Sequence, residues 1–282
     1  MIPIFRKNSN TTDDLRFEFG KNWSRFLSGM TEARVQRSVE CVRRLVGNLE
    51  GKTFLDVGSG SGLDSLSAIR LGASRVFSFD YDEESVTCSR VMKRRFAPDS
   101  NWTIEQGSAL DEHYIRSLGT FDIVYSWGVL HHTGDMWKAL DLVTIPVKDK
   151  LVIAIYNDQG FSSRAWQAEK RLYVSVPAIR PILAISVFLF GWLPKVRHPK
   201  RLLSDWRRYD RGMSPWRDAV DWAGGYPFEV ATPPDIASFY RDRGFLLESS
   251  KILHRGNCGC NQFVLVRRER PASESRVHVG AA

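Results

Sequence analysis

The stretch Phe54–Leu66, FLDVGSGSGLDSL, joins an apolar run, an acidic residue and three alternating glycines. The run predicts a strand that ends near Asp56, and Gly58, Gly60 and Gly62 predict a turn into a helix. Alternating glycines let the backbone bend sharply and admit a ligand against bare N–H groups, which a Cβ would block. This turn is therefore the first candidate for a ligand site.

The glycine pattern differs from that of a dinucleotide-binding loop. Counting G-x-G-x-x-G/A from Gly58 puts Leu63 where Gly or Ala is needed, and counting from Gly60 puts Ser65 there. A loop that presents the carboxylate of Asp56 suits a cationic ligand better than a pyrophosphate.

A second acid, Asp80, ends the short apolar run RVFSFD and lies 18 residues beyond Gly62. That offset is close to the ~20 residues at which an acid binds ribose hydroxyls in Rossmann-type sites. The alternative is a structural βαβ unit without a ligand. Open α/β sheets bind ligands at this edge, which favours the functional interpretation.

These motifs resemble those of the class I S-adenosylmethionine-dependent methyltransferases, whose motif I reads D/E-x-G-x-G-x-G. The resemblance implies S-adenosylmethionine as the cofactor. By position, Asp56 would lie near its methionine amine, the three glycines beneath its methionine and ribose, and Asp80 at its ribose hydroxyls.

The resemblance also implies contacts on the adenine side. Tyr81 follows Asp80 where the family often stacks an apolar residue on adenine, and EQGSALD contributes Ser108 and Ala109 from the adenine-edge motif. Ser108 departs from the family pattern, which usually has an acid there. Asp111 is instead predicted to cap a helix.

The stretch FDIVYSWGVLHHTGD, residues 121–135, is similar to the motif after the fourth strand in methyltransferases of the ubiquinone/menaquinone-biosynthesis type. It implies that Trp127, His131 and His132 lie beside the cofactor. His131 is the candidate general base, because an imidazole can take a hydroxyl proton near neutral pH. The alternatives are that these histidines only bind backbone groups, or that the acceptor needs no base.

Two further acceptor contacts are predicted downstream, in DWAGGYPFE. Tyr226 and Glu229, together with His132, are the candidate substrate residues. The alternative is that the two glycines and Pro227 only shape a loop. No metal site is predicted, since Cys258 and Cys260 lack partner ligands at a suitable spacing and adjacent histidines point apart.

Strand and helix patterns alternate up to Tyr156 and resume at Thr232, which predicts an α/β fold. The sheet is expected to be doubly wound, mainly parallel and seven-stranded, with an antiparallel C-terminal hairpin and an inserted cap segment. The predicted strands are Thr53–Val57, Arg75–Phe79, Trp102–Gln106, Phe121–Ser126, Lys150–Tyr156, Phe245–Leu253 and Gln262–Val266. The predicted helices run from Thr31 to about Glu50, from the glycines to about Leu71, over Glu83–Phe96, near Glu112–Ser117, over Asp135–Thr144 and from Pro233 to Gly244.

The same alternation divides the chain into five segments. They are an N-terminal lid at 1–30, a cofactor-binding Rossmann-like half at 31–158, an insertion at 159–231, a C-terminal helix and hairpin at 232–270, and a disordered tail at 271–282. No signal peptide is expected, because the first residues lack an apolar core, so a cytoplasmic location is predicted.

The insertion has, over residues 159–212, eleven Lys and Arg residues against three acids, a difference that equals the whole net charge of +8. Its apolar core, Ile182–Leu193, is shorter than the ~20 residues of a membrane span. Two interpretations remain, of which the first is favoured: a buried cap helix over the active site, or an anchor on anionic lipid over residues 180–201, at the inner face of the membrane.

The predicted function is methyl transfer to a small-molecule or lipid-linked acceptor, at oxygen. One alternative is an RNA methyltransferase whose basic insertion follows phosphates. Nucleic acid is the less favoured partner, since the chain has no N-P-P-Y-like string after the fourth strand. The other alternative is a cofactor-binding protein that docks a partner through Ile182–Leu193 without catalysis.

Overall fold

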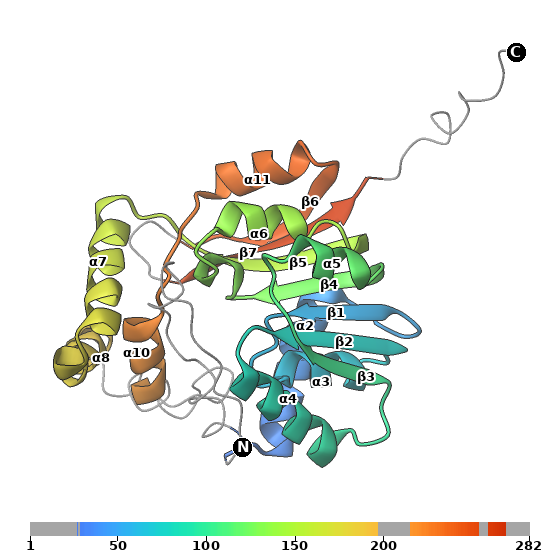
Figure 1. Ribbon diagram of the computed structural model, residues 1–282, viewed down its shortest axis with the longest axis horizontal. Helices are drawn as coiled ribbons and strands as arrows, with labels where there is room; N and C mark the ends of the chain where they lie inside the picture. Colours follow the sequence, from blue (N-terminus) through green and yellow to red (C-terminus); the bar gives the residue numbers. More distant parts are fainter. Residues whose placement is uncertain (1–26, 28, 197–214, 254–258, 269–282) are drawn as a thin grey trace, which may run out of the picture.

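The computed structural model describes residues 27, 29–196, 215–253 and 259–268. Seven strands form one sheet in the order β3-β2-β1-β4-β5-β7-β6, as Figure 1 shows. Strands β1 to β5 are parallel, and β7 runs antiparallel to both β5 and β6. The predicted α/β fold with a seven-stranded sheet and a C-terminal hairpin is confirmed. The strands are β1 (Thr53–Val57), β2 (Arg75–Asp80), β3 (Trp102–Gln106), β4 (Phe121–Trp127), β5 (Val147–Tyr156), β6 (Phe245–Lys251) and β7 (Cys260–Arg267).

Helices cover both faces of the sheet. One face packs against α2 (Glu32–Val46), α3 (Leu63–Arg70) and α4 (Glu83–Phe96), and the other against α5 (Glu112–Ser117), α6 (Met136–Leu142) and α11 (Pro233–Arg241). Because side chains alternate along a strand, Phe54 joins the first core and Leu55 the second.

Several predicted boundaries differ from the observed ones by a few residues, two of them for a clear local reason. The helix expected to reach Glu50 ends at Val46, since Gly47 adopts a φ of 77°. The strand expected from Lys150 begins at Val147, after a bulge in its pairing with β4, and the exposed Lys148 pairs with Asp122 at 2.6 Å.

Side chains cap most of these helices as their sequences predict. Asp111 accepts a hydrogen bond from the N–H of Tyr114 at 3.0 Å, and Thr232 accepts one from the N–H of Asp235 at 3.4 Å. Thr31 occupies the N-cap position of α2, but its side chain makes no such bond. The buried valines 35, 39, 42 and 46 hold α2 instead.

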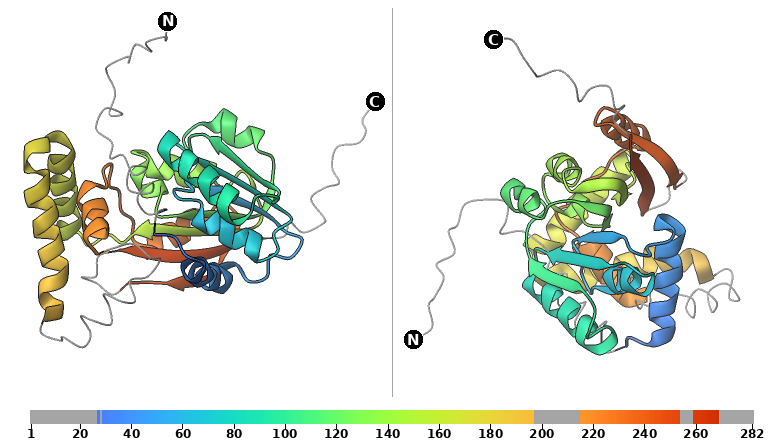
Figure 2. Two further views of the ribbon diagram at one scale, coloured as in Figure 1. Left: turned by 90° about the horizontal axis from the view of Figure 1, so that it is seen from below. Right: turned by 90° about the vertical axis from the view of Figure 1, so that its right-hand side faces the viewer.

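The insertion forms a separate group of helices beside the sheet, as Figures 1 and 2 show. It contains α7 (Phe161–Ser175), the short η3 (Pro177–Ile179), α8 (Arg180–Val196) and α10 (Pro215–Gly224), which share a small apolar core. Its two ends meet at a parallel bridge between Asn157 and Ala231. The lid predicted at 1–30 lies almost wholly outside the described residues, and the tail at 271–282 lies entirely outside them.

No single helix of the described ranges is long and apolar enough to cross a membrane. Phe161–Ser175 and Pro177–Gly191, bent by 111° where they meet, pass the same test of length and composition only as a pair.

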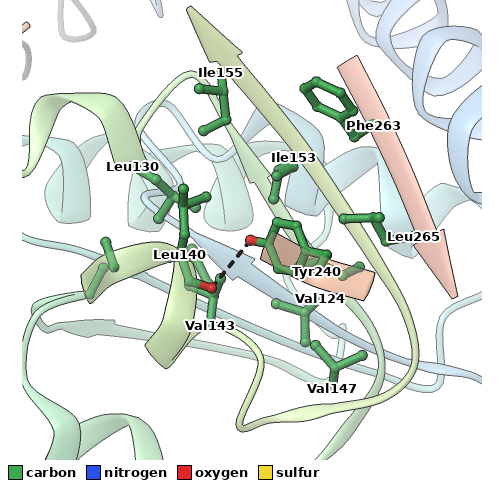
Figure 3. Close-up of a cluster of buried hydrophobic side chains, with 14 of the residues drawn as sticks. Val124, Leu130, Leu140, Val143, Val147, Ile153, Ile155, Tyr240, Phe263 and Leu265 are labelled. Atoms are coloured by element: carbon green, nitrogen blue, oxygen red, sulfur yellow. Dashed lines mark hydrogen bonds between the residues drawn. The ribbon is translucent and has the colours of Figure 1, made fainter. Parts of the chain in front are cut away.

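The hydroxyl of Tyr240 makes a buried hydrogen bond inside the apolar core drawn in Figure 3, where it donates to the carbonyl of Leu140 at 3.2 Å. Leu140 lies in the last turn of α6, where carbonyls lack helical donors. We expect Tyr240→Phe to lower the free energy of unfolding by about 1 kcal/mol in urea denaturation, because the buried carbonyl loses its donor.

Tyr114→Phe is the matched control, since its hydroxyl donates to Glu105 at 3.3 Å where water can replace it. Its expected loss is below ~0.5 kcal/mol. Equal losses in the two variants would contradict a special role for the buried bond.

Candidate functional site

The turn between β1 and α3 holds its three glycines at positive φ, with values of 76°, 52° and 76° for Gly58, Gly60 and Gly62. A Cβ on Gly58 would lie 2.3 Å from Cγ1 of Val129, and one on Gly62 would lie 2.8 Å from Oγ of Ser89. Glycine is therefore required at both positions, because the turn packs directly against neighbouring segments.

The N–H groups of this turn already bind protein acceptors. Gly58 donates to the carbonyl of Phe79 at 2.9 Å, and Gly60 donates to Oδ2 of Asp80 at 2.8 Å. The expectation of bare N–H groups is wrong for these two glycines, since the turn folds back onto the end of β2. The result is a turn held in place beside Asp80.

The carboxylate of Asp80 lies where the turn and the end of β2 meet. It is half-buried and accepts hydrogen bonds from the N–H groups of Gly60 and of Asp82, at 2.8 Å and 2.9 Å. Burial raises its pKa to about 6, and these two N–H groups oppose that shift. Further hydrogen-bond donors stabilise the charged form of a poorly solvated carboxylate. The two neighbouring hydroxyls of a ribose are suitable donors.

Asp56 lies beneath the turn rather than on its surface. Its side chain is buried, and its Oδ2 accepts a 2.6 Å hydrogen bond from the hydroxyl of Ser65 in α3. This bond ties the end of β1 to the helix that follows the turn. The contact of Asp56 with a ligand amine stays a prediction.

The segment after β3 also reaches this edge of the sheet, because the N–H of Gly107 donates to the carbonyl of Asp80 at 3.0 Å. The side chain of Ser108 accepts from the N–H of Leu110 at 3.2 Å, and Ala109 packs into the core. The predicted adenine-side residues thus lie at or just beyond the carboxyl ends of β2, β3 and β4: Tyr81, Ser108, Ala109 and Trp127.

His131 follows β4 in the short helix η2 (Leu130–His132) and is fully buried. Neither of its ring nitrogens makes a hydrogen bond. Burial lowers its pKa well below the usual value, and the charges of His132 and Lys170 lower it further. A polar contact from the backbone of Ala154 opposes this shift without reaching hydrogen-bond geometry. The imidazole is therefore neutral at physiological pH, the form that accepts a proton.

An aromatic cluster of Tyr156, Trp166, Trp222 and Phe228 lies beside His131. The ring of Tyr156, at the end of β5, is centred 3.9 Å from that of His131 and 5.3 Å from that of Trp222. Trp222 belongs to α10, so the cluster joins the sheet edge to the insertion. Sequence reasoning missed it, although the carboxyl ends of parallel strands were the place to look.

Lys170, counted above within the basic stretch, is fully buried against this cluster. Its ammonium donates to the carbonyl of Trp222 and lies 4.3 Å from the ring centre of Trp222 and 4.9 Å from that of Phe228. Aromatic faces attract a cation, which lowers the cost of burying it. Lys170 thus joins α7 to α10.

Glu229 is engaged with the start of α6. Its carboxylate accepts from the N–H groups of Gly134 and Met136 at 3.1 Å and 3.0 Å, and its own N–H donates to the carbonyl of His131 at 3.0 Å. Burial raises its pKa. His132 joins the same loop, since its Nδ1 lies 2.6 Å from the carbonyl of Pro227.

These bonds agree with the alternative that the segment around Pro227 shapes a loop. The role of His132, Tyr226 and Glu229 in acceptor binding stays a prediction. Within the described ranges, no group of three or more His, Cys, Asp or Glu side chains is placed to hold a metal ion.

Residues 48–178 match the family described as methyltransferase domain. The chain carries a methyltransferase domain. Ribosomal protein L11 methyltransferase of Thermotoga maritima is 40% identical over 77 residues, which are 27% of this chain and 27% of that protein. The chain thus spans about a quarter of the length of this relative. Ubiquinone biosynthesis O-methyltransferase of Paramagnetospirillum magneticum is 26% identical over 204 residues, 71% of this chain and 61% of that protein.

The fold of the domain is also found in solved structures. Magnesium protoporphyrin IX methyltransferase of Synechocystis with bound SAM superposes with a TM-score of 0.55 at 16% identity, over 93% of this chain and 100% of that one. The predicted methyltransferase fold is therefore confirmed, and residues 48–178 carry the matched methyltransferase domain.

We expect Gly58→Ala to lower the free energy of unfolding by at least ~2 kcal/mol, because the new Cβ meets Val129 and the left-handed backbone is strained. Gly119→Ala is the control: its φ is 75°, but nothing lies within 4 Å of a Cβ there. Its expected loss is ~1 kcal/mol, from backbone strain alone. Val129→Ala, added to Gly58→Ala, should recover part of the difference, and no recovery would contradict the packing argument.

Proposed function

We propose that this chain is an S-adenosylmethionine-dependent methyltransferase that methylates an oxygen atom of a small-molecule or lipid-linked acceptor. The contact between Gly60 and Asp80 carries the proposal. It joins the glycine turn to the second acid at the carboxyl edge of a sheet whose residues belong to a methyltransferase domain.

The residues at this edge fit the cofactor. S-adenosylmethionine, when bound, supplies a methyl group on a positively charged sulfonium. Asp80 would accept the ribose hydroxyls, and the charge of Asp56 and Asp80 favours a cation over a pyrophosphate. The remaining proposed contacts are those carried over by position: Gly58, Gly60, Gly62, Tyr81, Ser108, Ala109 and Trp127.

The acceptor is proposed to bind beyond β4 and β5, where His131 meets the aromatic cluster. His131 would accept the hydroxyl proton of the acceptor at a ring nitrogen, because the ring is neutral and its nitrogens make no hydrogen bond. Tyr156 and Trp222 would exclude water and orient a flat or apolar acceptor. His132 and Glu229 bind the loops around this place, and both, with Tyr226, are the proposed further contacts of the acceptor.

Two further observations support an oxygen acceptor of small size. The match to the ubiquinone biosynthesis O-methyltransferase extends over 71% of this chain, well beyond the matched domain. The match to the ribosomal protein L11 methyltransferase covers 27% of it. A cytoplasmic location stays a prediction.

The cofactor site can be tested with S-adenosylhomocysteine in calorimetric titration. We expect micromolar binding that Asp80→Ala abolishes, because the ribose hydroxyls lose their acceptor. Since the pKa of Asp80 is about 6 and hydroxyl donors need the charged carboxylate, affinity should be constant above that pH and fall about tenfold per pH unit below it.

Asp111→Ala is the matched control, because it removes an aspartate that caps α5 at the surface and should leave the affinity unchanged. An Asp80→Ala variant that folds and still binds with wild-type affinity would refute the assignment of this site.

The acceptor class can be tested with radiolabelled S-adenosylmethionine and a fractionated cell extract. We expect label in the small-molecule or organic-soluble fraction, and its release as methyl iodide by hydriodic acid, which cleaves O-methyl ethers and esters but not C-methyl groups. Label confined to RNA or protein would replace this acceptor class by one of those. Because the experiment measures methyl transfer itself, it also tests the alternative that the chain binds the cofactor without catalysis. Transfer of label would exclude that alternative, and no transfer would support it.

His131→Gln should lower the rate of that transfer by about 100-fold, the lower end of general-base effects, while S-adenosylhomocysteine affinity stays within twofold. Because burial lowers the pKa of His131 well below its usual range, the wild-type rate should stay constant as the pH falls from 8 to ~6. Half-loss of rate near pH ~6.5 would point to an exposed base of ordinary pKa instead.

A further inference from the structure

Helix α8 is apolar around its whole circumference over residues 182–190, where Ser186 is the one polar residue. Such a helix is normally surrounded by apolar neighbours. One face does pack inside the insertion, where Ala184 and Val187 are buried against α7 and α10. Among the described residues, none buries the opposite face in this way.

The uncovered face forms a continuous stripe. Ile182 and Phe190 are 66% and 67% exposed, and Ile185 and Leu189 between them are also exposed. Figures 1 and 2 show α8 at the outer edge of the molecule, with α10 between it and the sheet. The favoured expectation of a buried cap helix is therefore not met by this face, which lies opposite the buried Ala184 and Val187.

Basic residues predominate on α7 and α8, on either side of the stripe in the sequence. Between residues 161 and 191 the sequence has four basic residues and one acid, Glu169. The carboxylate oxygens of that acid are buried, and burial raises its pKa. The exposed charges Arg164, Arg171 and Arg180 are all basic; Lys195 lies in the last turn of the helix, and three more basic residues follow it in the sequence up to residue 201.

We propose that this face of α8 docks on the surface of a membrane that contains anionic lipids. An exposed apolar stripe flanked by cations matches the boundary between acyl chains and anionic headgroups. The helix would lie in the plane of that boundary, because no single described helix is long enough to cross it. A protein partner or a second copy of the chain would gain less from flanking charges of one sign.

This surface goes beyond the proposed methyl transfer and does not depend on it. Its consequence is local: the helices α7 and α10, which contact both α8 and the aromatic cluster, would lie next to the bilayer. An acceptor dissolved in or anchored to that bilayer would then reach the proposed acceptor side over a short path.

The test is co-sedimentation of the full chain with vesicles of phosphatidylcholine alone or mixed with phosphatidylglycerol, without acceptor. We expect binding to the mixed vesicles that weakens as salt rises. Ile182→Gln with Phe190→Gln should weaken it by about tenfold or more, because two apolar side chains no longer enter the interface. Arg164→Glu with Arg171→Glu should weaken binding to the mixed vesicles, which carry anionic phosphatidylglycerol. It should not change any residual binding to the neutral phosphatidylcholine vesicles.

Leu246→Gln with Leu247→Gln is the matched control, since these leucines are exposed on β6, outside the insertion, and should leave binding unchanged. Each variant is first titrated with S-adenosylhomocysteine, so that a folding defect is seen separately. Binding that the α8 variant leaves intact would overturn the proposal. Equal binding to neutral and mixed vesicles would also overturn it. A third contrary result would be a wild-type chain that is a dimer in solution and an α8 variant that is a monomer.

Discussion

The hydrogen bond from the backbone of Gly60 to the carboxylate of Asp80 is the contact on which the arrangement of the site depends. It forms because β1 and β2 are parallel neighbours in register, with Val57 beside Phe79, so that their carboxyl ends coincide. The two apolar cores, one on each face of the sheet, stabilise that register. The bond opposes the rise that burial causes in the pKa of Asp80. The turn and the acid thus stabilise each other in the positions a ligand needs.

Most of the fold could be predicted because strands and helices of different periodicity alternate along the chain. The observed bounds of β3 and α5 equal the predicted ones, since each is a short run between clear turn signals. The errors arose where a single glycine or charged pair decided the boundary. Gly47 ended α2 early, and the pair of Lys148 with Asp122 extended β5 through residues that look like a loop. Such pairings depend on a neighbouring strand, which a local pattern does not contain.

The cofactor side of the candidate site could be predicted from the sequence more fully than the proposed acceptor side. The glycine turn and Asp80 lie within one short βαβ unit, so their spacing alone predicts that they meet. The acceptor side is assembled from the ends of β4 and β5, from α7 and from α10, which are far apart in sequence. Lys170 looked like one surface charge among many, yet it is buried among aromatic rings. Glu229 looked like an acceptor contact, yet its carboxylate binds the start of α6.

The bridge between Asn157 and Ala231 closes the insertion at its base. The N–H of Asp158 donates to the carbonyl of Ala231 at 3.2 Å, and the side chain of Asn157 accepts from Asn261 of β7 at 3.0 Å. The chain therefore leaves the sheet and returns to it at one point, next to the end of the pairing between β5 and β7 at Tyr156 and Cys260. An insertion attached in this way can lengthen, shorten or be exchanged in evolution without a change in strand register. The proposed acceptor side and the proposed membrane surface can then diverge in evolution while the sheet stays constant.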